Sequence, residues 1–220
     1  MIYAVISDIH SDIHSLNSVL NRIKTMKCDK IICLGDIVGY GENAEEVVQE
    51  IINENITCVC GNHEKALFNE EAFEFMNHKT KNAINANYDK LTVNSLDFLK
   101  FLPDFLVENS IRFVHSMPPS SVYEYLSHTE KEEIVKLSKK YSEHIVFCGH
   151  THENEIVKFK NTNVTRIKNI QIDFDYDLSK SYRYIINVGS VSLPRKSEDT
   201  EKVFVLYDSV SSHLRFIKSE

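Results

Sequence analysis

Short apolar runs alternate with amphipathic segments over the first sixty residues of the chain. Three apolar runs are each short enough to form a buried strand: residues 2–7, 30–34 and 56–60. Between them lie two segments whose apolar residues recur every three or four positions, at residues 13–23 and 44–53, and Asp12 stands where it can cap the first helix. This order predicts a largely parallel sheet covered by helices.

A different pattern fills residues 64–102, which are polar, rich in Asn and aromatic residues, and lack a run typical of a strand. The stretch predicts two or three helices inserted between strands, and such an insertion could act as a lid. Because no Gly/Ser-rich linker divides the chain, residues 1–220 are predicted to form one domain.

Strand patterns resume after Pro103 and dominate the rest of the chain. One helix is predicted among them, opened by a capping box of Thr129 and Glu132. The predicted strands are residues 105–108, 111–114, 145–148, 155–159, 164–167, 170–174, 184–188, 203–207 and 214–217. A strand-rich half after an alternating α/β half indicates two sheets packed face to face with helices outside.

Composition narrows the class mainly by exclusion. Of 220 residues, 42% are hydrophobic and 26% are charged, which fits a globular chain and excludes disordered and collagen-like classes. The formal net charge of −7 repels phosphate backbones, so general nucleic-acid binding is not expected. Five Cys without a paired CxxC framework, no signal-peptide pattern and no apolar run of about 20 residues predict a cytoplasmic protein that is not embedded in a membrane.

Histidine is the unusual residue type, with 10 in the chain, and half of them share one context. At five places a predicted strand is followed closely by His, Asp or Asn, usually beside Gly. The five places are Asp8-Ile-His10, Gly35-Asp36-Ile-Val-Gly39, Gly61-Asn62-His63-Glu64, Val114-His115 and Gly149-His150-Thr-His152. Because the carboxyl ends of strands in an open α/β sheet form the ligand crevice, these side chains are expected to meet at one patch.

Imidazole, carboxylate and amide oxygen without thiolate suit Mn, Fe, Co, Ni or Zn. In Asp8-x-His10 and His150-x-His152, residues two apart in an extended segment point to the same side, so each pair is expected to deliver two ligands to one cluster. Seven candidate ligands are too many for one ion, whereas two ions about 3.5–4 Å apart and bridged by Asp36 would use them all. A single buried His is more often a hydrogen-bonded core residue, so the set as a whole carries the prediction.

The remaining histidines and the cysteines have simpler interpretations. Glu64 is expected to orient His63 or to cap the helix that follows. Three cysteines at strand ends are predicted to be small buried hydrophobes: Cys33, Cys60 and Cys148. The histidines outside the pattern are predicted to lie on the surface: His14, His78, His128, His144 and His213.

Taken in order and at these intervals, the five motifs resemble those of the calcineurin-like metallophosphoesterases, in particular the small bacterial and archaeal phosphodiesterase-like branch. The resemblance runs from Asp8 to His152 and extends to Asn187-Val-Gly-Ser190 and Pro194-Arg195. It implies an α/β fold of four layers, an αββα sandwich of two mixed β-sheets flanked by helices. It also implies a hydrolase that cleaves phosphodiesters, phosphomonoesters or both, with a small phosphate ester or a nucleotide as substrate.

The resemblance further implies a role for each motif residue. The implied ligands are Asp8, His10 and His152 for one divalent transition metal ion, Asn62, His115 and His150 for the other, and Asp36 as the bridge. Manganese is the first candidate metal, with Fe, Ni, Co and Zn as alternatives. A hydroxide between the ions would attack phosphorus, while His63 would steady the phosphoryl oxygens or protonate the leaving group. Arg195 is expected to bind the phosphate through its fork of donors.

Two departures from the family pattern narrow the expected activity. Protein Ser/Thr phosphatases carry Asp-Arg-Gly after the second motif, where the Arg grips phosphate, whereas this chain continues Val38-Gly39-Tyr40-Gly41. They also end in one His where this chain has His150 and His152. Both differences disfavour a dedicated phosphoprotein phosphatase.

Several alternatives stay open beside the phosphoesterase. Within the enzyme class they are a protein phosphatase and a dinucleoside-polyphosphate phosphatase. Outside it, the alternative is a catalytically idle metal-binding scaffold of the same fold. A scaffold is expected to lose ligands, whereas every ligand position here holds a competent side chain. A homo-oligomer is also compatible with the sequence.

Overall fold

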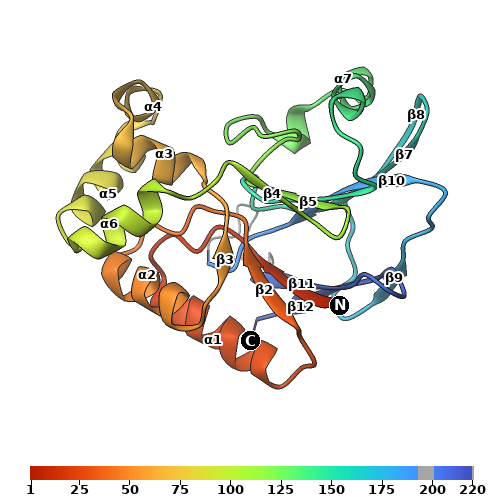
Figure 1. Cartoon of the computed structure of the whole chain (residues 1–220). Coiled ribbons are helices and arrows are strands. Elements are labelled where there is room, and N and C mark those ends of the chain that lie inside the picture. Colours follow the sequence, from red (N-terminus) through yellow and green to blue (C-terminus); the bar gives the residue numbers. More distant parts are fainter. Residues whose placement is uncertain (193–200, 220) are drawn as a thin grey trace.

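Two six-stranded β-sheets form the centre of the molecule, and helices cover their outer faces (Figure 1). The computed structural model describes residues 1–192 and 201–219. The first sheet has the strand order β3 (Thr57–Cys58), β2 (Lys30–Cys33), β1 (Ile2–Ile6), β11 (Val203–Asp208), β12 (His213–Lys218), β9 (Asp175–Asp177). The second has the order β4 (Phe105–Glu108), β5 (Ile111–Val114), β6 (Ile145–Cys148), β10 (Arg183–Val188), β7 (Asn154–Lys160), β8 (Asn163–Ile167).

Helices lie on the outer face of each sheet and in the inserted segment. They are α1 (Ile13–Lys24), α2 (Ala44–Asn53), α3 (Asn62–Phe68), α4 (Glu70–Glu74), α5 (His78–Tyr88), α6 (Val93–Lys100) and α7 (Lys131–Leu137). Two short 3-10 turns, Leu126–His128 and Ser138–Lys140, flank α7. In the described part of the chain, none of these helices is long and apolar enough to cross a membrane.

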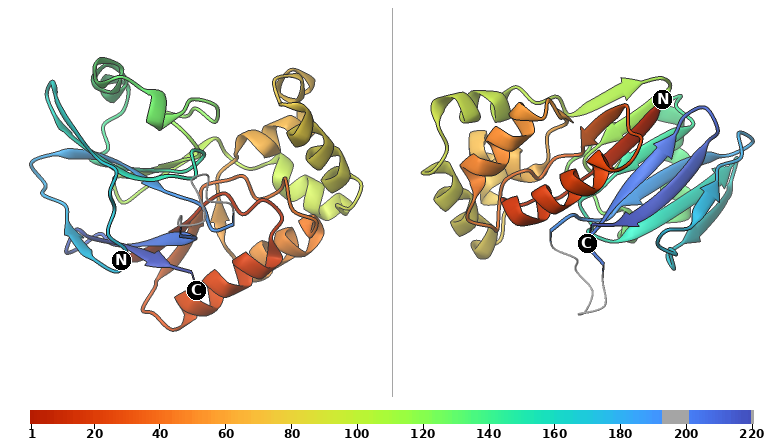
Figure 2. Two further views of the ribbon diagram at one scale, coloured as in Figure 1. Left: turned by 180° about the vertical axis from the view of Figure 1, so that it is seen from behind. Right: turned by 90° about the horizontal axis from the view of Figure 1, so that it is seen from below.

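Three hydrophobic clusters define the layers of the sandwich. One joins the first sheet to α1 and α2, a second fills the space between the two sheets, and a third joins the second sheet to α7. Figure 2 shows the two sheets face to face, with α1 and α2 on the outside of the first. The predicted four-layer αββα sandwich with two mixed sheets is thus confirmed.

Strand β1 shows why the sequence builds these layers. Its residues alternate between the two faces of the sheet. Tyr3 and Val5 point into the cluster between the sheets, whereas Ala4 and Ile6 point toward the helices. Because both faces are covered, all four side chains are buried and the strand is a continuous apolar run.

Parallel pairing brings the ends of the strands to a common edge. In the first sheet, β1 pairs in parallel with β2, and β2 with β3, so that Ile6 lies opposite Cys33. In the second sheet, β6 pairs in parallel with both β5 and β10, and Cys148 lies opposite Asn187. The loops that follow these strands therefore start at nearly the same level and can share one site.

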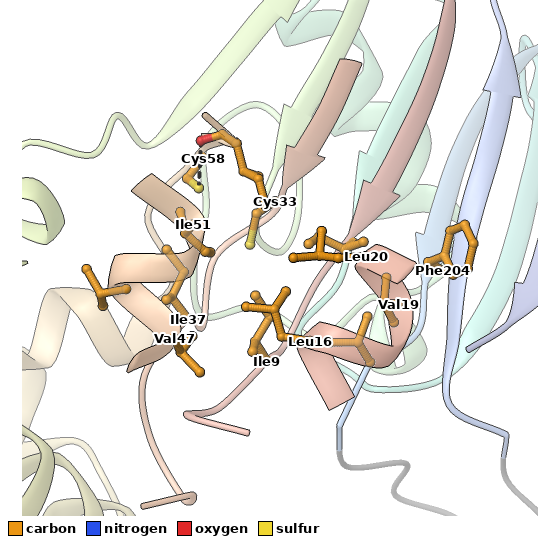
Figure 3. Packing of buried hydrophobic residues seen from close by; sticks show 14 of the residues in the cluster. Ile9, Leu16, Val19, Leu20, Cys33, Ile37, Val47, Ile51, Cys58 and Phe204 are labelled. Carbon is orange, nitrogen blue, oxygen red and sulfur yellow. Dashed lines mark hydrogen bonds between the residues drawn. The ribbon is translucent and has the colours of Figure 1, made fainter. Parts of the chain in front are cut away.

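Apolar residues within two of these loops fix them to the core. Ile9 lies between Asp8 and His10 in sequence, and Ile37 follows Asp36. Both side chains are fully buried in the cluster beneath α1 and α2, near Leu16 and Val47 (Figure 3). Since burying one such side chain stabilises the fold by roughly 1.5–3 kcal/mol, each loop is held by its own anchor.

Three predictions about elements need correction. The strand predicted at 170–174 forms at Asp175–Asp177 instead, because a turn with Asp173 in a left-handed conformation occupies the predicted segment. Thr129 does not cap α7, since its hydroxyl donates to the carbonyl of Tyr125 and Glu130 takes the N-cap position. The insertion contains four helices where two or three were predicted, and the first begins at Asn62.

Candidate metal centre

The eight side chains predicted to form the site come together at the carboxyl ends of the parallel strands. Asp8 and His10 follow β1, and Asp36 follows β2. His115 follows β5, while His150 and His152 follow β6. The last two side chains, Asn62 and His63, begin α3. All eight are buried, with at most 7% of any side chain exposed.

Three triads of side chains each bring one ligand atom per residue within 4.8 Å of the others. Two of them share no residue: one is Asp8, His10 and His152, and the other is Asp36, His115 and His150. The third, His10, Asp36 and His63, overlaps both. Asn62 joins the triad of His115 and His150, because its Oδ1 lies 3.0 Å from His115 Nε2. The two triads without a shared residue, together with Asn62, correspond to the two groups of ligands that the sequence resemblance implies.

Asp36 belongs to the triad of His115 and His150 and also faces the triad of Asp8, His10 and His152. Its Oδ1 is 3.4 Å from His115 Nε2, and its Oδ2 is 3.9 Å from His10 Nε2. His63 borders the same carboxylate, with Nε2 3.8 Å from Asp36 Oδ2. Each oxygen of Asp36 therefore faces a different triad, as a bridging ligand requires.

We call the loops that carry the candidate ligands the metal loops. Their backbone is strained, which the sequence did not indicate. Five candidate ligands have a positive φ: Asp8 (57°), His10 (50°), Asp36 (50°), His150 (67°) and His152 (57°). The expectation that Asp8-x-His10 and His150-x-His152 are extended is therefore wrong, although both pairs converge. Such conformations cost about 1–3 kcal/mol each and persist where surrounding structure enforces them, often at functional sites.

Glu64 holds part of this strained backbone in place through hydrogen bonds. Its carboxylate accepts hydrogen bonds from the backbone N–H groups of Asp36 (2.9 Å), Ile37 (2.8 Å) and Val38 (3.1 Å). It also accepts one from Gly61 (2.8 Å), which caps the start of α3. Of the two roles expected for Glu64, the structure supports the cap, and it adds the loop of Asp36 to what the carboxylate holds. The close approach of Gly61 to Asp36 requires glycine, because a Cβ there would lie 2.2 Å from Asp36 Oδ1.

The opposite side of the site is held by the segment after β10. Ser190 and Ser192 both donate from Oγ to the carbonyl of Asp8, each at 2.9 Å. Asn187 donates to the carbonyl of Gly149 at 2.7 Å and so fixes the residue before His150. Arg195, predicted to bind phosphate, lies outside the described residues.

Backbone carbonyls orient three of the imidazoles. His115 Nδ1 lies 2.8 Å from the carbonyl of Leu34, His150 Nε2 lies 3.2 Å from that of Tyr123, and His10 Nδ1 lies 3.4 Å from that of Val38. Because a carbonyl can only accept, it selects the tautomer that carries the proton on the outer nitrogen. When the imidazoles are neutral, the inner nitrogens present lone pairs to the site, as in metal-binding histidines whose second nitrogen is held by a carbonyl.

Acceptor atoms consequently face one another across short distances. His10 Nε2 is 3.0 Å from His152 Nε2, and His115 Nε2 is 3.2 Å from His150 Nδ1. Asp8 Oδ1 is buried, lies 3.1 Å from His152 Nε2 and has no well-aligned hydrogen-bond donor among the described residues. This donor set of imidazole nitrogens, carboxylates and one amide oxygen suits divalent transition metals, so the residues present fit the cofactor implied by the resemblance.

The buried ionisable groups of the site shift one another's pKa values. Burial disfavours the Asp36 carboxylate, but the neighbouring His115 and His63 outweigh burial and hold its pKa well below the usual range. Burial also opposes the charged form of His115, yet the carboxylates of Asp36 and Asp8 raise its pKa to about 10. Burial together with the nearby His63 lowers the pKa of His10 to about 3. The site thus keeps the Asp36 carboxylate ionised inside the protein, with a positively charged His115 and a neutral His10 beside it near pH 7.

Aromatic side chains that the sequence analysis did not single out line the site. The Tyr40 ring lies 4.8 Å from the His10 ring and 5.1 Å from the His63 ring, centroid to centroid. On the other side, the Tyr125 ring lies 4.3 Å from the His150 ring. The position of Tyr40 beside the second motif was the available signal, whereas Tyr125 lies in a loop without a pattern.

The structure also tests the simpler interpretations. Cys33, Cys60 and Cys148 are buried as predicted. The histidines outside the pattern are exposed as predicted: His14, His78, His128, His144 and His213.

Comparison with known proteins agrees with this arrangement. The family model for the calcineurin-like phosphoesterase superfamily domain matches residues 1–211. An uncharacterized protein of Methanocaldococcus jannaschii is 32% identical over 222 residues, which cover 99% of this chain and 86% of that protein. The crystal structure of a metallophosphoesterase from Sphaerobacter thermophilus matches with a TM-score of 0.82 and 26% identity, over 100% of this chain and 88% of that chain. A hypothetical protein from Pyrococcus horikoshii has the same fold, with a TM-score of 0.75 and 18% identity over 99% of this chain and 87% of that chain.

The family model spans nearly the whole chain, and the two sheets and the candidate ligands at the strand ends agree with it. The chain therefore belongs to the calcineurin-like phosphoesterase superfamily.

Proposed function

We propose that the protein is a hydrolase that cleaves small phosphate esters at a centre of two divalent metal ions. The observation that carries this proposal is the convergence of buried His and Asp side chains into triads that meet at Asp36. Membership of a phosphoesterase superfamily supports the reaction class. The substrates we propose are small diesters, small monoesters and nucleotides.

The residues have the following roles in this proposal. One ion would be held by Asp8, His10 and His152, the other by Asn62, His115 and His150, with Asp36 shared between them. When bound, two such ions lower the pKa of water to give a nucleophile near neutral pH and offset the negative charge on the phosphoryl oxygens. We propose manganese as the first candidate, with Fe, Ni, Co and Zn as alternatives, because imidazole and carboxylate ligands suit all of them.

The protein contributes rigid placement of these ligands. The backbone N–H of His63 donates to Asp36 Oδ1 at 3.0 Å, and Glu64 holds the backbone of Asp36 from the other side. Burial of the ligand side chains keeps bulk water away, which strengthens the electrostatic interactions inside the site.

His63 is proposed to face the substrate. Its Nδ1 is buried and makes no hydrogen bond with the described residues, so no protein group fixes the proton at that atom. Burial lowers the pKa of His63, which keeps the imidazole neutral near pH 7. An anionic phosphate beside the ring would raise that pKa, and His63 could then protonate the leaving oxygen or stabilise charge on the phosphoryl group.

The test is reconstitution of the metal-free protein with Mn, Fe, Co, Ni or Zn, one at a time, followed by a panel of mono- and diesters. We expect hydrolysis that depends on added metal, close to two metal equivalents per chain by elemental analysis, and loss of both in Asp36→Ala. His14→Ala serves as a matched control, because His14 is exposed and lies outside the site. The control should match the wild-type protein in metal content and rate.

Two outcomes would overturn parts of the proposal. Full activity with one metal equivalent would contradict the two-metal centre. Two bound equivalents without turnover of any ester would instead favour the idle metal-binding scaffold.

A further inference from the structure

The side chain of Asn87, near the end of α5, joins the helical insertion to both metal loops of the first sheet. Its Oδ1 accepts hydrogen bonds from Ser11 Oγ (2.7 Å) and from the backbone N–H of Gly39 (2.6 Å). Its Nδ2 donates to the carbonyl of Gly41 at 3.0 Å. Only 1% of Asn87 is exposed, so these bonds are made away from water.

The partners of Asn87 fix the orientation of its amide. A backbone N–H can be satisfied only by Oδ1, and a backbone carbonyl only by Nδ2. The Asn87 amide therefore cannot be turned over without losing the bonds to Gly39 and Gly41 together. No other side chain of similar size offers an acceptor and a donor in this geometry.

The loops that Asn87 joins also contact each other at the candidate ligands. The backbone N–H of Gly41 donates to the carbonyl of His10 at 2.8 Å, and that of Ser11 donates to the carbonyl of Ile37 at 2.9 Å. Ser11 directly follows His10 and has a positive φ of 58°. Asn87 thus supports one of the strained positions beside the site.

Gly39, which Asn87 holds through its backbone N–H, packs against the rings of two histidines of the site. Its φ is +135°, and a Cβ at this position would lie 2.2 Å from His63 Nδ1 and 2.9 Å from His10 Nδ1. The backbone of Gly39 is therefore in close contact with both rings. A shift of Gly39 would move the rings or leave a gap beneath them.

We propose that Asn87 is a positioning residue that holds the His10 loop and the Gly39 loop at the spacing needed for metal binding. The inference rests on the proposed function, because it assigns the purpose of this spacing to the metal centre. Replacing the amide with an apolar group removes three hydrogen bonds. The carbonyl of Gly41 then loses its Asn87 partner, and the backbone N–H of Gly39 keeps only the longer bond to Ser11 Oγ, at 3.2 Å. The loops can then relax out of their left-handed conformations, and His10 moves away from His152.

The test compares Mn²⁺ affinity, steady-state kinetics and the unfolding temperature of Asn87→Leu with those of the wild-type protein. Residues that orient metal ligands typically contribute about 10–100-fold in metal affinity or activity. We expect Asn87→Leu to bind Mn²⁺ more weakly by about this factor in titrations of metal-free protein. At saturating Mn²⁺, kcat should fall more than KM changes, because the substrate does not touch Asn87.

Ser95→Ala is the matched control. Ser95 is buried in the same insertion, and its Oγ accepts a hydrogen bond from Gln49 of α2 at 3.0 Å, away from the site. This variant should lower the unfolding temperature without changing Mn²⁺ affinity. If Asn87→Leu binds Mn²⁺ as the wild-type protein does and only its unfolding temperature falls, Asn87 is merely structural and the inference is wrong.

Two further measurements keep the test decisive. If Asn87→Leu does not fold, Ser11→Ala removes two bonds of the same network, one to Asn87 Oδ1 and one from the backbone N–H of Gly39, and it too should weaken Mn²⁺ binding; unchanged affinity would overturn the inference. If the wild-type protein hydrolyses no ester but Asn87→Leu still binds Mn²⁺ more weakly, the proposed function fails while the positioning role stands.

Discussion

The residues of the site fall into two groups. The candidate ligands bring charge and lone pairs to one place, whereas other residues hold the backbone of the ligand loops. Glu64 belongs to the second group, because it accepts hydrogen bonds from four backbone N–H groups around Asp36 and Gly61. Burial and the nearby Asp36 carboxylate raise the pKa of Glu64 to about 7. His63 belongs to neither group, because it is in the site but is surplus to the implied ligand set.

Substitution of His63 with Asn separates its two proposed roles. We expect His63→Asn to retain both metal equivalents, since the other ligands are intact. If His63 protonates the leaving group, the rate falls little on p-nitrophenyl esters, whose leaving group is a weak base, and falls by roughly 10²–10⁴-fold on alkyl esters. The measurement is kcat/KM for both ester classes together with elemental analysis.

The two other outcomes have distinct meanings. An equally large loss on both ester classes would assign His63 to charge stabilisation on the phosphoryl oxygens. Unchanged rates on both classes would mean that His63 has no part in catalysis, and the interpretation of the Asn62-His63 motif would be wrong.

The candidate ligands could be predicted from the sequence because each stands directly after a strand or at the start of a helix. Asn87 could not, since it lies in an Asn-rich stretch where nothing distinguishes it from Asn85 or Asn82. Its three bonds join residues 46 to 76 positions away in the sequence. Only the path of α5 past the metal loops reveals them.

Pairs of elements are joined by polar contacts as well as by the core. Arg112 of β5 forms a bidentate ion pair with Glu143, which precedes β6, through bonds of 3.1 and 3.2 Å. Glu143 is only 9% exposed, so this pair is more costly to break than a surface pair. It connects neighbouring strands whose far ends carry His115 and the His150 loop.

The Arg112–Glu143 pair should make stability depend on pH. Burial raises the pKa of Glu143, but the hydrogen bonds from Arg112 outweigh it and the folded-state pKa lies below the usual value. A depressed folded-state pKa adds stability that is present above the unfolded pKa of about 4.3 and is lost as the pH falls through the folded value. Glu143→Gln should therefore lower the free energy of unfolding at pH 7 by roughly 1.5–3 kcal/mol, and this deficit should shrink in acid.

Denaturant unfolding at several pH values between 7 and 3 would measure the difference between Glu143→Gln and the wild-type protein. Glu54→Gln is the control, because Glu54 pairs with the more exposed Lys24 and solvent screening leaves little stability to lose. A deficit for Glu143→Gln that stays constant down to pH 3 would contradict the assignment.

The inserted helices are expected to act as a fixed wall. Besides the bonds of Asn87, the hydroxyl groups of Tyr40 and Thr80 lie 3.1 Å apart and tie α5 to the loop beside His10. We expect hydrogen exchange of the α5 amides to be unchanged when Mn²⁺ and inorganic phosphate are added. Slower exchange across α5 with both present would show that the insertion closes like the lid predicted as an alternative.

Element boundaries followed the sequence wherever a hydrophobic face repeated for several turns. Helix α2 begins and ends at the predicted residues, and Asp12 caps α1 by accepting a hydrogen bond from the backbone N–H of Ser15. The strand predicted at 170–174 failed because Asp173 takes a left-handed conformation in a turn at the surface, where Phe174 is exposed and Ile170 and Ile172 are only partly buried. The register was decided by pairing with β12, which places Tyr176 opposite Leu214.

At the scale of the whole molecule, the sandwich brings distant segments to one edge. The first sheet supplies Asp8, His10 and Asp36, and the second supplies the remaining strand-end histidines. Phe113 and Phe147 stack between the sheets, with ring centroids 5.6 Å apart and planes at 13°. The layers were predictable because apolar alternation determines which faces are covered, whereas the spacing of the two triads depends on how the sheets pack.

The shape of the site leads to a prediction about substrate class. Protein Ser/Thr phosphatases carry a phosphate-binding Arg after the second motif, whereas this chain continues Gly39-Tyr40-Gly41. Tyr40 packs against His10 and His63, and its hydroxyl lies beside that of Thr80, so an aromatic ring borders the site in this segment. The chain also has a formal net charge of −7, which disfavours acidic phosphopeptides at long range.

We therefore expect the reconstituted protein to turn over small aryl diesters or monoesters with a kcat/KM at least about tenfold above that for any phosphopeptide, a difference of about 1.4 kcal/mol in transition-state binding. The measurement uses one metal, one pH and two ionic strengths. Long-range repulsion predicts that added salt improves the phosphopeptide rate, whereas the missing Arg predicts a preference that persists at high salt. A phosphopeptide hydrolysed much faster than every small ester would contradict the prediction, because Tyr40 and the α5 wall would then have to admit a protein chain to the site.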